Sequence, residues 1–167
     1  MFHPELNQIA MMFPFGLDNT RDGIYINLKT VHRCFIIVIV EQGADATQHT
    51  FTLKQATAGA GTATGTGEKA LLVAGQAWAN QDCFTGAVES NILAAVTPTL
   101  GAYQTDVNVS RTKLLVFDVL PERDMDIANG FSCIGSDSTD IGAANLAGAF
   151  AILIPSRYAP IGNVFAD

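Results

Sequence analysis

The sequence contains few charged residues, and basic residues are the scarcer kind. Only 15% of its 167 residues are charged, against about 25% in an ordinary soluble domain. Nine Lys and Arg face 16 Asp and Glu, which gives a formal net charge of −7, and no basic cluster occurs. Because nucleic-acid binding depends on cations that neutralise phosphates, we expect no direct contact with nucleic acid. So little charge suggests that a partner covers part of the surface; a compact domain with a surface of Thr, Ser and Ala is the alternative.

Long apolar runs are also absent. The longest one, residues 34–40, is far shorter than the roughly 20 residues that span a membrane. Residues 1–5 lack the basic start and the apolar core of a signal peptide. The sequence therefore predicts no membrane contact and a protein that is made and kept in a cytoplasm.

Cysteine is scarce and widely spaced. Cys34 and Cys133 lie within predicted strands, where a free cysteine usually behaves as a small buried hydrophobic residue, and Cys83 is the third. No disulfide framework is expected, although one pair between chains in an exported particle is left open. His32 and Cys34 lie two residues apart on one strand, but structural zinc normally needs further closely spaced ligand pairs. We therefore predict no metal site.

The clearest strand signals occupy the last third of the chain, residues 110–158. Three segments there are rich in aromatic and branched residues, namely residues 113–120, 130–135 and 147–155. Each is bounded by Gly, Pro, Asn, Asp or Ser, which favour turns. We expect these three strands to form the centre of a β-sandwich.

Earlier segments predict further strands. Residues 24–31 alternate between apolar and polar, which is typical of a half-buried strand, whereas the apolar run 35–40 favours a strand covered on both faces. Turn residues at 43–47 predict a hairpin in which residues 49–56 return as the partner strand. The Ala/Gly/Thr segment 57–67 is predicted to be a loop that is mobile or contacts a partner.

These patterns together predict an all-β protein. Two more strands are expected at residues 69–74 and 76–84, and residues 86–96 predict either a short helix or a strand and loop. The count is about eight strands with at most one short helix and no βα alternation, which favours an antiparallel, jelly-roll-like β-sandwich. We expect one domain. We assign residues 21–160 to the sandwich, 1–20 to an N-terminal arm or edge segment, and 161–167 to a C-terminal tail.

Two short patterns resemble binding motifs without the required context. Residues 65–70 satisfy the spacing of a dinucleotide fingerprint, but a loop precedes them and a strand follows, where the motif needs a strand and a helix. Asp124, Asp126 and Asn129 resemble part of a calcium loop, yet Ala128 occupies a ligand position and no bidentate Glu follows. A turn rich in Asp and Asn is the simpler interpretation. We predict no cofactor.

No catalytic arrangement is recognisable either. Ser90, Ser110 and Ser156 lack the glycines of a nucleophile elbow. The three histidines are dispersed along the chain, which leaves no His-rich ligand set for a cupin-type metal centre. We therefore predict that the protein is not an enzyme and that it has no catalytic, cofactor-binding or metal-binding residues.

One resemblance rests on a series of short words in a fixed order. These are Thr-Leu-Lys-Gln at 52–55, Glu-Lys-Ala-Leu at 68–71, Phe-Asp-Val-Leu at 117–120, Asp-Met-Asp-Ile-Ala-Asn-Gly-Phe at 124–131, and Arg-Tyr at 157–158. Across residues 30–160 the chain resembles small virion proteins of tailed phages that are encoded near the major capsid protein, in particular the jelly-roll head decoration (cement) proteins.

The resemblance implies a structural role in a virion. Such a protein would bind the exterior of the capsid through the major capsid protein and stabilise the shell against the pressure of packaged DNA, after synthesis in the host cytoplasm. Symmetry positions on a shell make a homo-dimer or homo-trimer natural. Exposure and composition suggest partner contacts in the N-terminal segment and in the Thr-rich loop, at Met11, Met12, Phe13, Phe15, Thr62, Thr64 and Thr66.

Two other functions are left open by the sequence. A carbohydrate-binding module would use exposed aromatic residues beside Asp and Asn, and Trp78, Tyr103 and Tyr158 are the candidates for a stacking platform. A head–tail joining or tail component would instead be present in few copies per particle.

Overall fold

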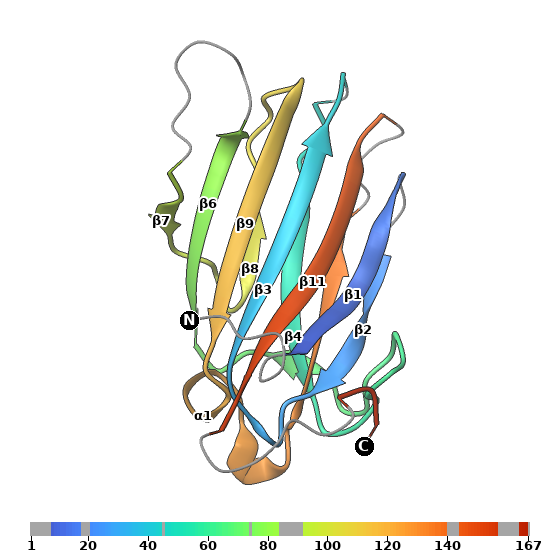
Figure 1. Cartoon of the computed structure of the whole chain (residues 1–167), viewed down its shortest axis with the longest axis vertical. Coiled ribbons are helices and arrows are strands. Elements are labelled where there is room, and N and C mark those ends of the chain that lie inside the picture. Colours follow the sequence, from blue (N-terminus) through green and yellow to red (C-terminus); the bar gives the residue numbers. More distant parts are fainter. Residues whose placement is uncertain are drawn as a thin grey trace.

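The computed structural model describes residues 8–17, 21–44, 46–73, 75–83, 92–139, 144–156 and 164–166. Within them the chain forms two antiparallel sheets that pack against each other as a β-sandwich (Figure 1). Eleven strands are described, and eight of them have six residues or more. The helical elements described are α1 (Pro121–Asp124) and one 3-10 turn, Ile127–Asn129. The predicted fold class is confirmed.

The first sheet has six strands. Their order across the sheet is β1 (Gln8–Leu17), β11 (Leu146–Pro155), β3 (Val31–Gln42), β9 (Arg111–Val119), β6 (Gln76–Cys83) and β7 (Ala94–Val96).

The second sheet has five strands. Its order is β2 (Arg21–Asn27), β10 (Cys133–Ser138), β4 (Thr50–Ala56) and β5 (Lys69–Ala70), and β8 (Ala102–Gln104) also pairs with β4.

The pairing of strands gives the sandwich a jelly-roll topology. The first four strands alternate between the two sheets, and each pairs with a strand from the second half of the chain: β1 with β11, β2 with β10, β3 with β9 and β4 with β8. The two halves of the chain therefore run side by side and wind together around one core, as in a jelly roll.

The predicted hairpin between residues 35–40 and 49–56 is wrong. Both edges of β3 are occupied, by β9 on one side and β11 on the other, and β4 pairs with β10 in the opposite sheet. Turn residues signal that the chain reverses direction, but they do not specify whether the next strand joins the same sheet. The segment after β3 carries the chain across the sandwich.

Other expectations concern the ends and the region after β6. Of the two alternatives predicted for residues 86–96, the described end fits the strand and not the helix, because Ala94–Val96 pair with β6 as strand β7; residues 84–91 lie outside the described part. Residues 8–17 of the N-terminal segment form the edge strand β1. Near the C-terminus, Val164 is buried in the core and its carbonyl accepts a hydrogen bond from the Asn27 backbone.

The core lies between the sheets and combines aromatic residues with small ones. Phe51 lies at its centre, with ring centroids 5.9 Å from Phe13 and 5.4 Å from Phe117. The inward residues of β11 include three buried alanines, at 147, 149 and 151. Because protein interiors are close-packed, large rings opposite small side chains let the two sheets approach evenly.

On the outer side of each sheet, an aromatic ring covers a glycine of a neighbouring strand. A Cβ atom added at Gly135 would lie 2.5 Å from Cζ of Tyr25, which is buried. In the six-stranded sheet a Cβ at Gly148 would lie 2.5 Å from Cδ2 of Phe15, whose side chain is exposed. Both glycines therefore provide room for a ring, but only one of the two rings is confined.

This contrast predicts unequal costs for two equivalent substitutions. Gly135→Ala should lower the free energy of unfolding by about 1–3 kcal/mol, because the Tyr25 ring cannot move aside. Gly148→Ala should cost much less, because the exposed Phe15 ring can swing away. Urea unfolding of both variants checks this, and equal losses would contradict it.

Candidate functional site

The outer face of the six-stranded sheet is apolar to an unusual degree. Along β3 the side chains of Ile36, Val38 and Val40 are buried, so the alternating residues Phe35, Ile37 and Ile39 point away from the core and are only partly covered. The sequence predicted that the run 35–40 would be covered on both faces. Within the described part of the protein only one face is covered, so this prediction is wrong.

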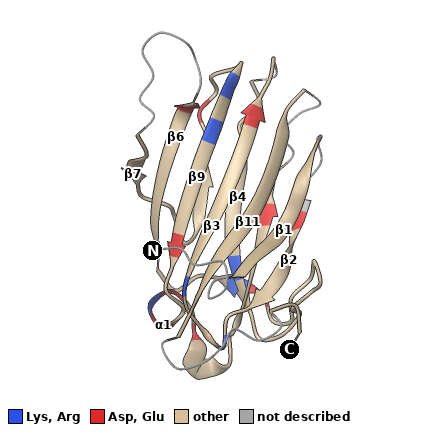
Figure 2. Ribbon diagram, in the orientation of Figure 1, with Lys and Arg blue, Asp and Glu red and all other residues tan. Residues whose placement is uncertain are grey.

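Neighbouring strands continue this surface. The register places Val116 of β9 and Phe150 of β11 on either side of Ile37, Trp78 of β6 beside Val116, and Met11 of β1 beside Phe150. We define the apolar face by its outward residues Ile9, Met11, Phe15, Phe35, Ile37, Ile39, Trp78, Leu114, Val116, Phe150 and Ile152. Figure 2 shows the charged residues of β3 and β9 toward the strand ends, which leaves the middle of the sheet uncharged.

The N-terminal contact candidates divide between this face and the core. Met11 and Phe15 are exposed, at 54% and 52%, whereas Met12 and Phe13 are buried in the core. The division follows from two register shifts in β1, between Met11 and Phe13 and between Phe13 and Gly16, which interrupt the simple alternation of a strand. Met12 and Phe13 are therefore not surface residues in this fold.

The Thr-rich loop lies on the other sheet. Its residues Thr62, Thr64 and Thr66 are exposed, but the loop is held in place by β2 and by its own hydrogen bonds: Tyr25 N donates to Thr62 O at 2.8 Å, and Thr62 Oγ1 donates to Thr64 O at 2.8 Å. It covers Tyr25 on the outer side of the five-stranded sheet. The two predicted groups of contacts thus belong to different sheets.

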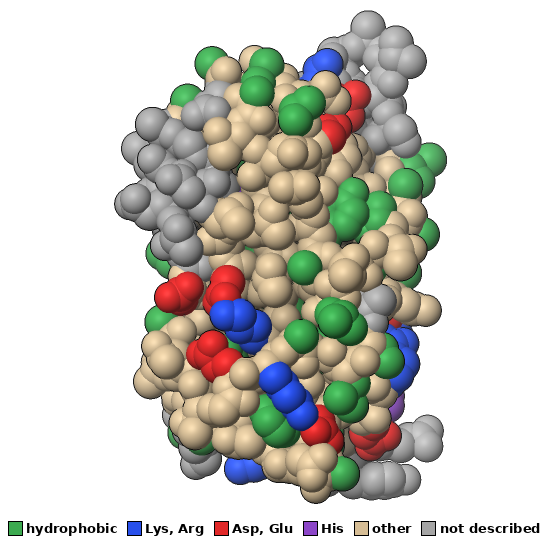
Figure 3. All heavy atoms as spheres, turned by 180° about the vertical axis from the view of Figure 1, so that it is seen from behind, with side chains coloured by type: hydrophobic (Ala, Val, Ile, Leu, Met, Phe, Trp, Pro, Cys, Tyr) green, Lys and Arg blue, Asp and Glu red, His purple; other side chains and the backbone are tan. Residues whose placement is uncertain are grey.

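The outer side of the five-stranded sheet has a different character. Lys54 pairs there with Asp137 and Glu68, and Lys69 pairs with Asp126 at 2.5 Å. Figure 3, which views the molecule from behind, shows charged side chains of both signs and only scattered hydrophobic ones. The sandwich therefore has one apolar and one polar outer side.

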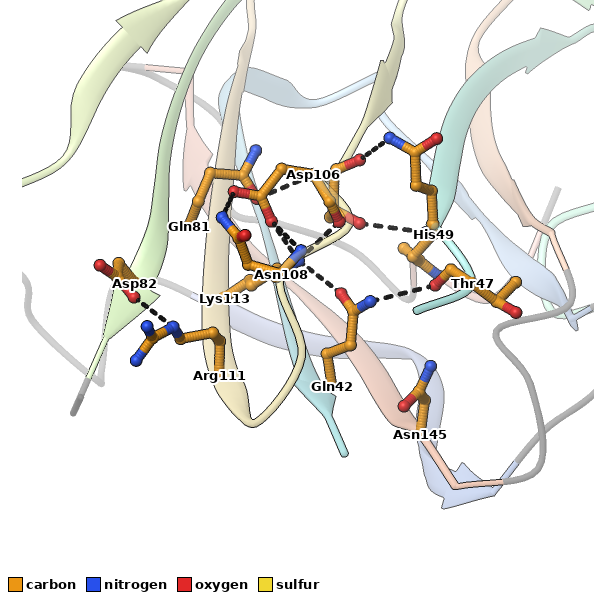
Figure 4. Close-up of polar contacts among 12 residues, drawn as sticks. Gln42, Thr47, His49, Gln81, Asp82, Asp106, Asn108, Arg111, Lys113 and Asn145 are labelled. Atoms are coloured by element: carbon orange, nitrogen blue, oxygen red, sulfur yellow. Dashed lines mark hydrogen bonds and ion pairs between the residues drawn. The ribbon is translucent and has the colours of Figure 1, made fainter. Parts of the chain in front are cut away.

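A buried polar cluster closes one end of the sandwich (Figure 4). The Lys113 side chain is fully buried, and its ammonium group donates to Gln42 Oε1, to Asp106 O at 2.7 Å and to Asp106 Oδ1 at 2.5 Å. Gln42 lies on β3 beside β9, and Asp106 lies in the loop that leads from β8 to β9. A buried charge needs such partners, because an unpaired one is very costly.

His49 lies in the same end of the molecule. Its backbone N–H donates to Thr105 Oγ1 at 3.0 Å, its Nδ1 is 3.4 Å from Ser138 Oγ, and its ring stacks on Phe51. The ring is buried, and among the described residues Nε2 has no hydrogen-bond partner. Removal from water disfavours the charged imidazolium, and this burial lowers the pKa of His49 to about 4.

A second group of ion pairs fixes the opposite end. Arg33 forms a bidentate pair with the buried carboxylate of Asp118, with both N–O distances 2.7 Å, and Arg123 pairs in the same way with the buried Asp124. Asp124 also accepts the Leu120 backbone N–H. The carboxylates that resembled a calcium loop are thus engaged by cations and amides, because Asp126 binds Lys69 and Asn129.

The structure also shows where the remaining sequence motifs lie. Residues 65–70 form a turn that leads into the short strand β5, so no helix start follows the glycines. Cys34, Cys83 and Cys133 are buried and form no disulfide, as predicted for Cys34 and Cys133, while His32 is exposed. Within the described residues no group of three His, Cys, Asp or Glu side chains gathers to hold a metal ion. None of the helices in that part reaches the length and apolarity of a membrane span.

Comparison of the chain with protein-family models, curated proteins and solved structures returns no match.

Trp78 and Tyr103, two of the three aromatic residues of the predicted stacking platform, do not lie together. Trp78 lies on the apolar face, whereas Tyr103 packs against the core and its hydroxyl accepts a hydrogen bond from Gln81 at 2.9 Å. Tyr158 lies outside the described residues. Beside Trp78 is an open hollow of about 230 Å³, lined by Gly75, Gln76, Ala77, Trp78, Ala95, Val96 and Thr97.

Burial of His49 predicts a loss of stability in acid. Its folded-state pKa of about 4 lies below the ordinary value of 6.5, so the unfolded chain binds one more proton between these values. The free energy of unfolding is fully retained above pH 6.5 and falls as the pH drops toward 4, by roughly 3 kcal/mol at most. Urea unfolding across this range should show the decline.

Two histidine variants isolate the effect. His49→Gln removes the titrating ring and should flatten the decline, whereas His32→Gln, at an exposed histidine, should retain it. The lowered pKa of Asp126, caused mainly by Lys69, acts in the same direction but only below its ordinary value of 3.8. An unchanged decline in His49→Gln would show that other groups cause it.

Proposed function

We propose that the protein is a structural virion component that binds the outer surface of a phage capsid through its apolar face and stabilises the shell. The observation that carries this proposal is the apolar face, which occupies the uncharged middle of the outer side of the six-stranded sheet. The resemblance of residues 30–160 to head decoration proteins and the jelly-roll fold, which those proteins share, support the same assignment.

The size of the apolar face is compatible with docking. Five strands spaced about 4.8 Å apart, each contributing about 20 Å of length, give a footprint of roughly 400–500 Å² before side-chain relief is added. Contiguous apolar patches larger than a few hundred Å² are rare on monomeric proteins and usually mark interaction sites. Specific interfaces bury about 800 Å² per partner, so loops around the face would add to the contact.

Capsid binding through such a face requires no chemistry from the protein. A protein that binds the assembled lattice and not its free subunits stabilises the lattice by mass action, in proportion to its affinity and concentration. Many copies acting together turn a modest affinity per site into a large effect on the shell. A rigid sandwich suits this role, because little conformational entropy is lost when it docks.

Carbohydrate binding is the second candidate. The hollow beside Trp78 favours it, since an aromatic ring at the wall of a shallow cavity is a common surface for sugar stacking. The single ring makes the platform smaller than the sequence suggested. Glycan binding there should change the tryptophan fluorescence, and Trp78 is the only tryptophan in the chain.

Charge placed on the apolar face should abolish capsid binding. Val116→Lys lies on the central strand β9 and points outward, so the fold should survive while docking would bury an unpaired ammonium group. We expect the affinity for expanded capsids that lack the protein to fall at least about tenfold, which corresponds to about 1.4 kcal/mol. Co-sedimentation with stoichiometry from densitometry measures this.

The matched control is Thr52→Lys. Thr52 lies on β4, points outward from the opposite sheet and sits beside Asp137 in the register, so the added charge is tolerated there. This variant should bind capsids like the wild type, saturate at hundreds of copies and raise capsid survival on heating. Equal loss in both variants, or no binding by the wild type, would refute docking through the apolar face.

A further inference from the structure

Besides satisfying the buried charge of Lys113, the buried polar cluster brings together three groups that can react with one another. Lys113 carries an amine, Gln42 a carboxamide and Asp106 a carboxylate. The first two are 0% and 1% exposed and lie on adjacent strands, and Nζ of Lys113 contacts Oε1 of Gln42 directly (Figure 4). Asp106 Oδ1 lies 2.5 Å from the same Nζ.

We propose that Lys113 and Gln42 become joined by an intramolecular isopeptide bond, which the folded protein forms itself with Asp106 as the proton-transfer group. This inference concerns a covalent modification and does not depend on capsid binding. It requires an amine held against the electrophilic carbon, a group that moves protons, and exclusion of water.

The reaction balances without any co-reactant. The Lys113 ammonium passes one proton to the Asp106 carboxylate, and the free amine attacks Cδ of Gln42. In the tetrahedral intermediate Asp106 delivers its proton to Nε2. As the Cδ–Nε2 bond breaks, the attacking nitrogen gives a further proton to Asp106, which passes it to the departing ammonia. The products are the secondary amide between Gln42 and Lys113 and one ammonium ion, so atoms and charge are conserved and nothing is oxidised or reduced.

The surrounding contacts hold the reacting groups in position. Nε2 of Gln42 donates to the Thr47 carbonyl at 3.4 Å, which turns the leaving nitrogen away from Lys113 and leaves Oε1 on the side of the amine. The Asp106 carboxylate is oriented by the backbone N–H and the side-chain amide of Asn108, at 3.1 and 2.8 Å. Fixed geometry of this kind raises the effective concentration of the amine by many orders of magnitude over a free reactant.

Burial also favours attack by the Lys113 amine over hydrolysis of the Gln42 carboxamide. An amide is a poor electrophile, and in open solution water greatly outnumbers any amine. Here the amine and the carboxamide are removed from water by the two sheets, while the carboxylate of Asp106, whose side chain is 36% exposed, connects the cluster to solvent. Ammonia can leave along that side, which makes the bond formation irreversible in practice.

Intact-mass spectrometry of the purified full-length protein tests the proposal. The folded protein should have a mass lower than its sequence mass by one ammonia, and a digest should contain one branched peptide that joins the Gln42 and Lys113 segments. The cross-link spans 71 residues of sequence and should raise the unfolding temperature relative to a variant that cannot form it.

Three variants separate the possible sources of a mass change. Lys113→Met keeps the length of the side chain without the amine and should retain its full mass. Asp106→Asn keeps much of the hydrogen bonding but cannot accept the proton, and should show little or no ammonia loss. Gln42→Glu retains the pairing with Lys113, and its bond formation would eliminate water instead of ammonia.

The mass of the wild-type protein is sufficient to test the proposal. A folded wild type with its full sequence mass, checked by circular dichroism, overturns the proposal whatever the variants show. Loss of one water from the wild type would indicate an amide bond between Lys113 and Asp106, and would overturn the assignment to Gln42. An ammonia loss that persists in Lys113→Met would reveal a different reaction elsewhere in the chain.

Discussion

The structure depends on the pairing of β3 along both of its edges. β11 and β9 occupy the two sides of this twelve-residue strand over most of its length, so segments from the start and the end of the chain must meet in the middle of one sheet. β2 and β4, which flank β3 in the sequence, are then excluded from its sheet and form the second one. The alternation of β3 also sorts its side chains, with Val38 in the core and Ile37 on the apolar face.

The buried charged groups lie at the two ends of the sandwich, and each has a partner. Lys113 is satisfied at one end by Gln42 and Asp106, and Asp118 is satisfied at the other by Arg33. Removal of one member of such a pair costs several kcal/mol, because the remaining charge is left unpaired in a poorly polarisable interior. The ends therefore fix the loops and the register of the strands, while the apolar centre supplies most of the driving force.

The sequence predicted the local elements well and their spatial relations poorly. Periodicity and turn residues identified the fold class and the segments that became β9, β10 and β11, because strand patterns are local. The predicted partner of β4 was wrong, because a turn sequence does not specify which sheet the next strand joins. Met12 and Phe13 were grouped with Met11 and Phe15, because the bulges that bury the first two depend on pairing with β11. The Lys113 cluster joins residues 71 positions apart and has no signature in any short window.

The difference between the two outer sides bears most directly on function. If both sides were polar, the low charge of the chain would only reflect a surface of Thr, Ser and Ala. The described residues instead place ion pairs on the five-stranded sheet and keep the middle of the six-stranded sheet free of charge. A protein with one such side has a preferred orientation on any partner, with its polar side toward solvent. That orientation is what a shell-binding protein requires, since each copy must cover the lattice without attracting further copies onto its back.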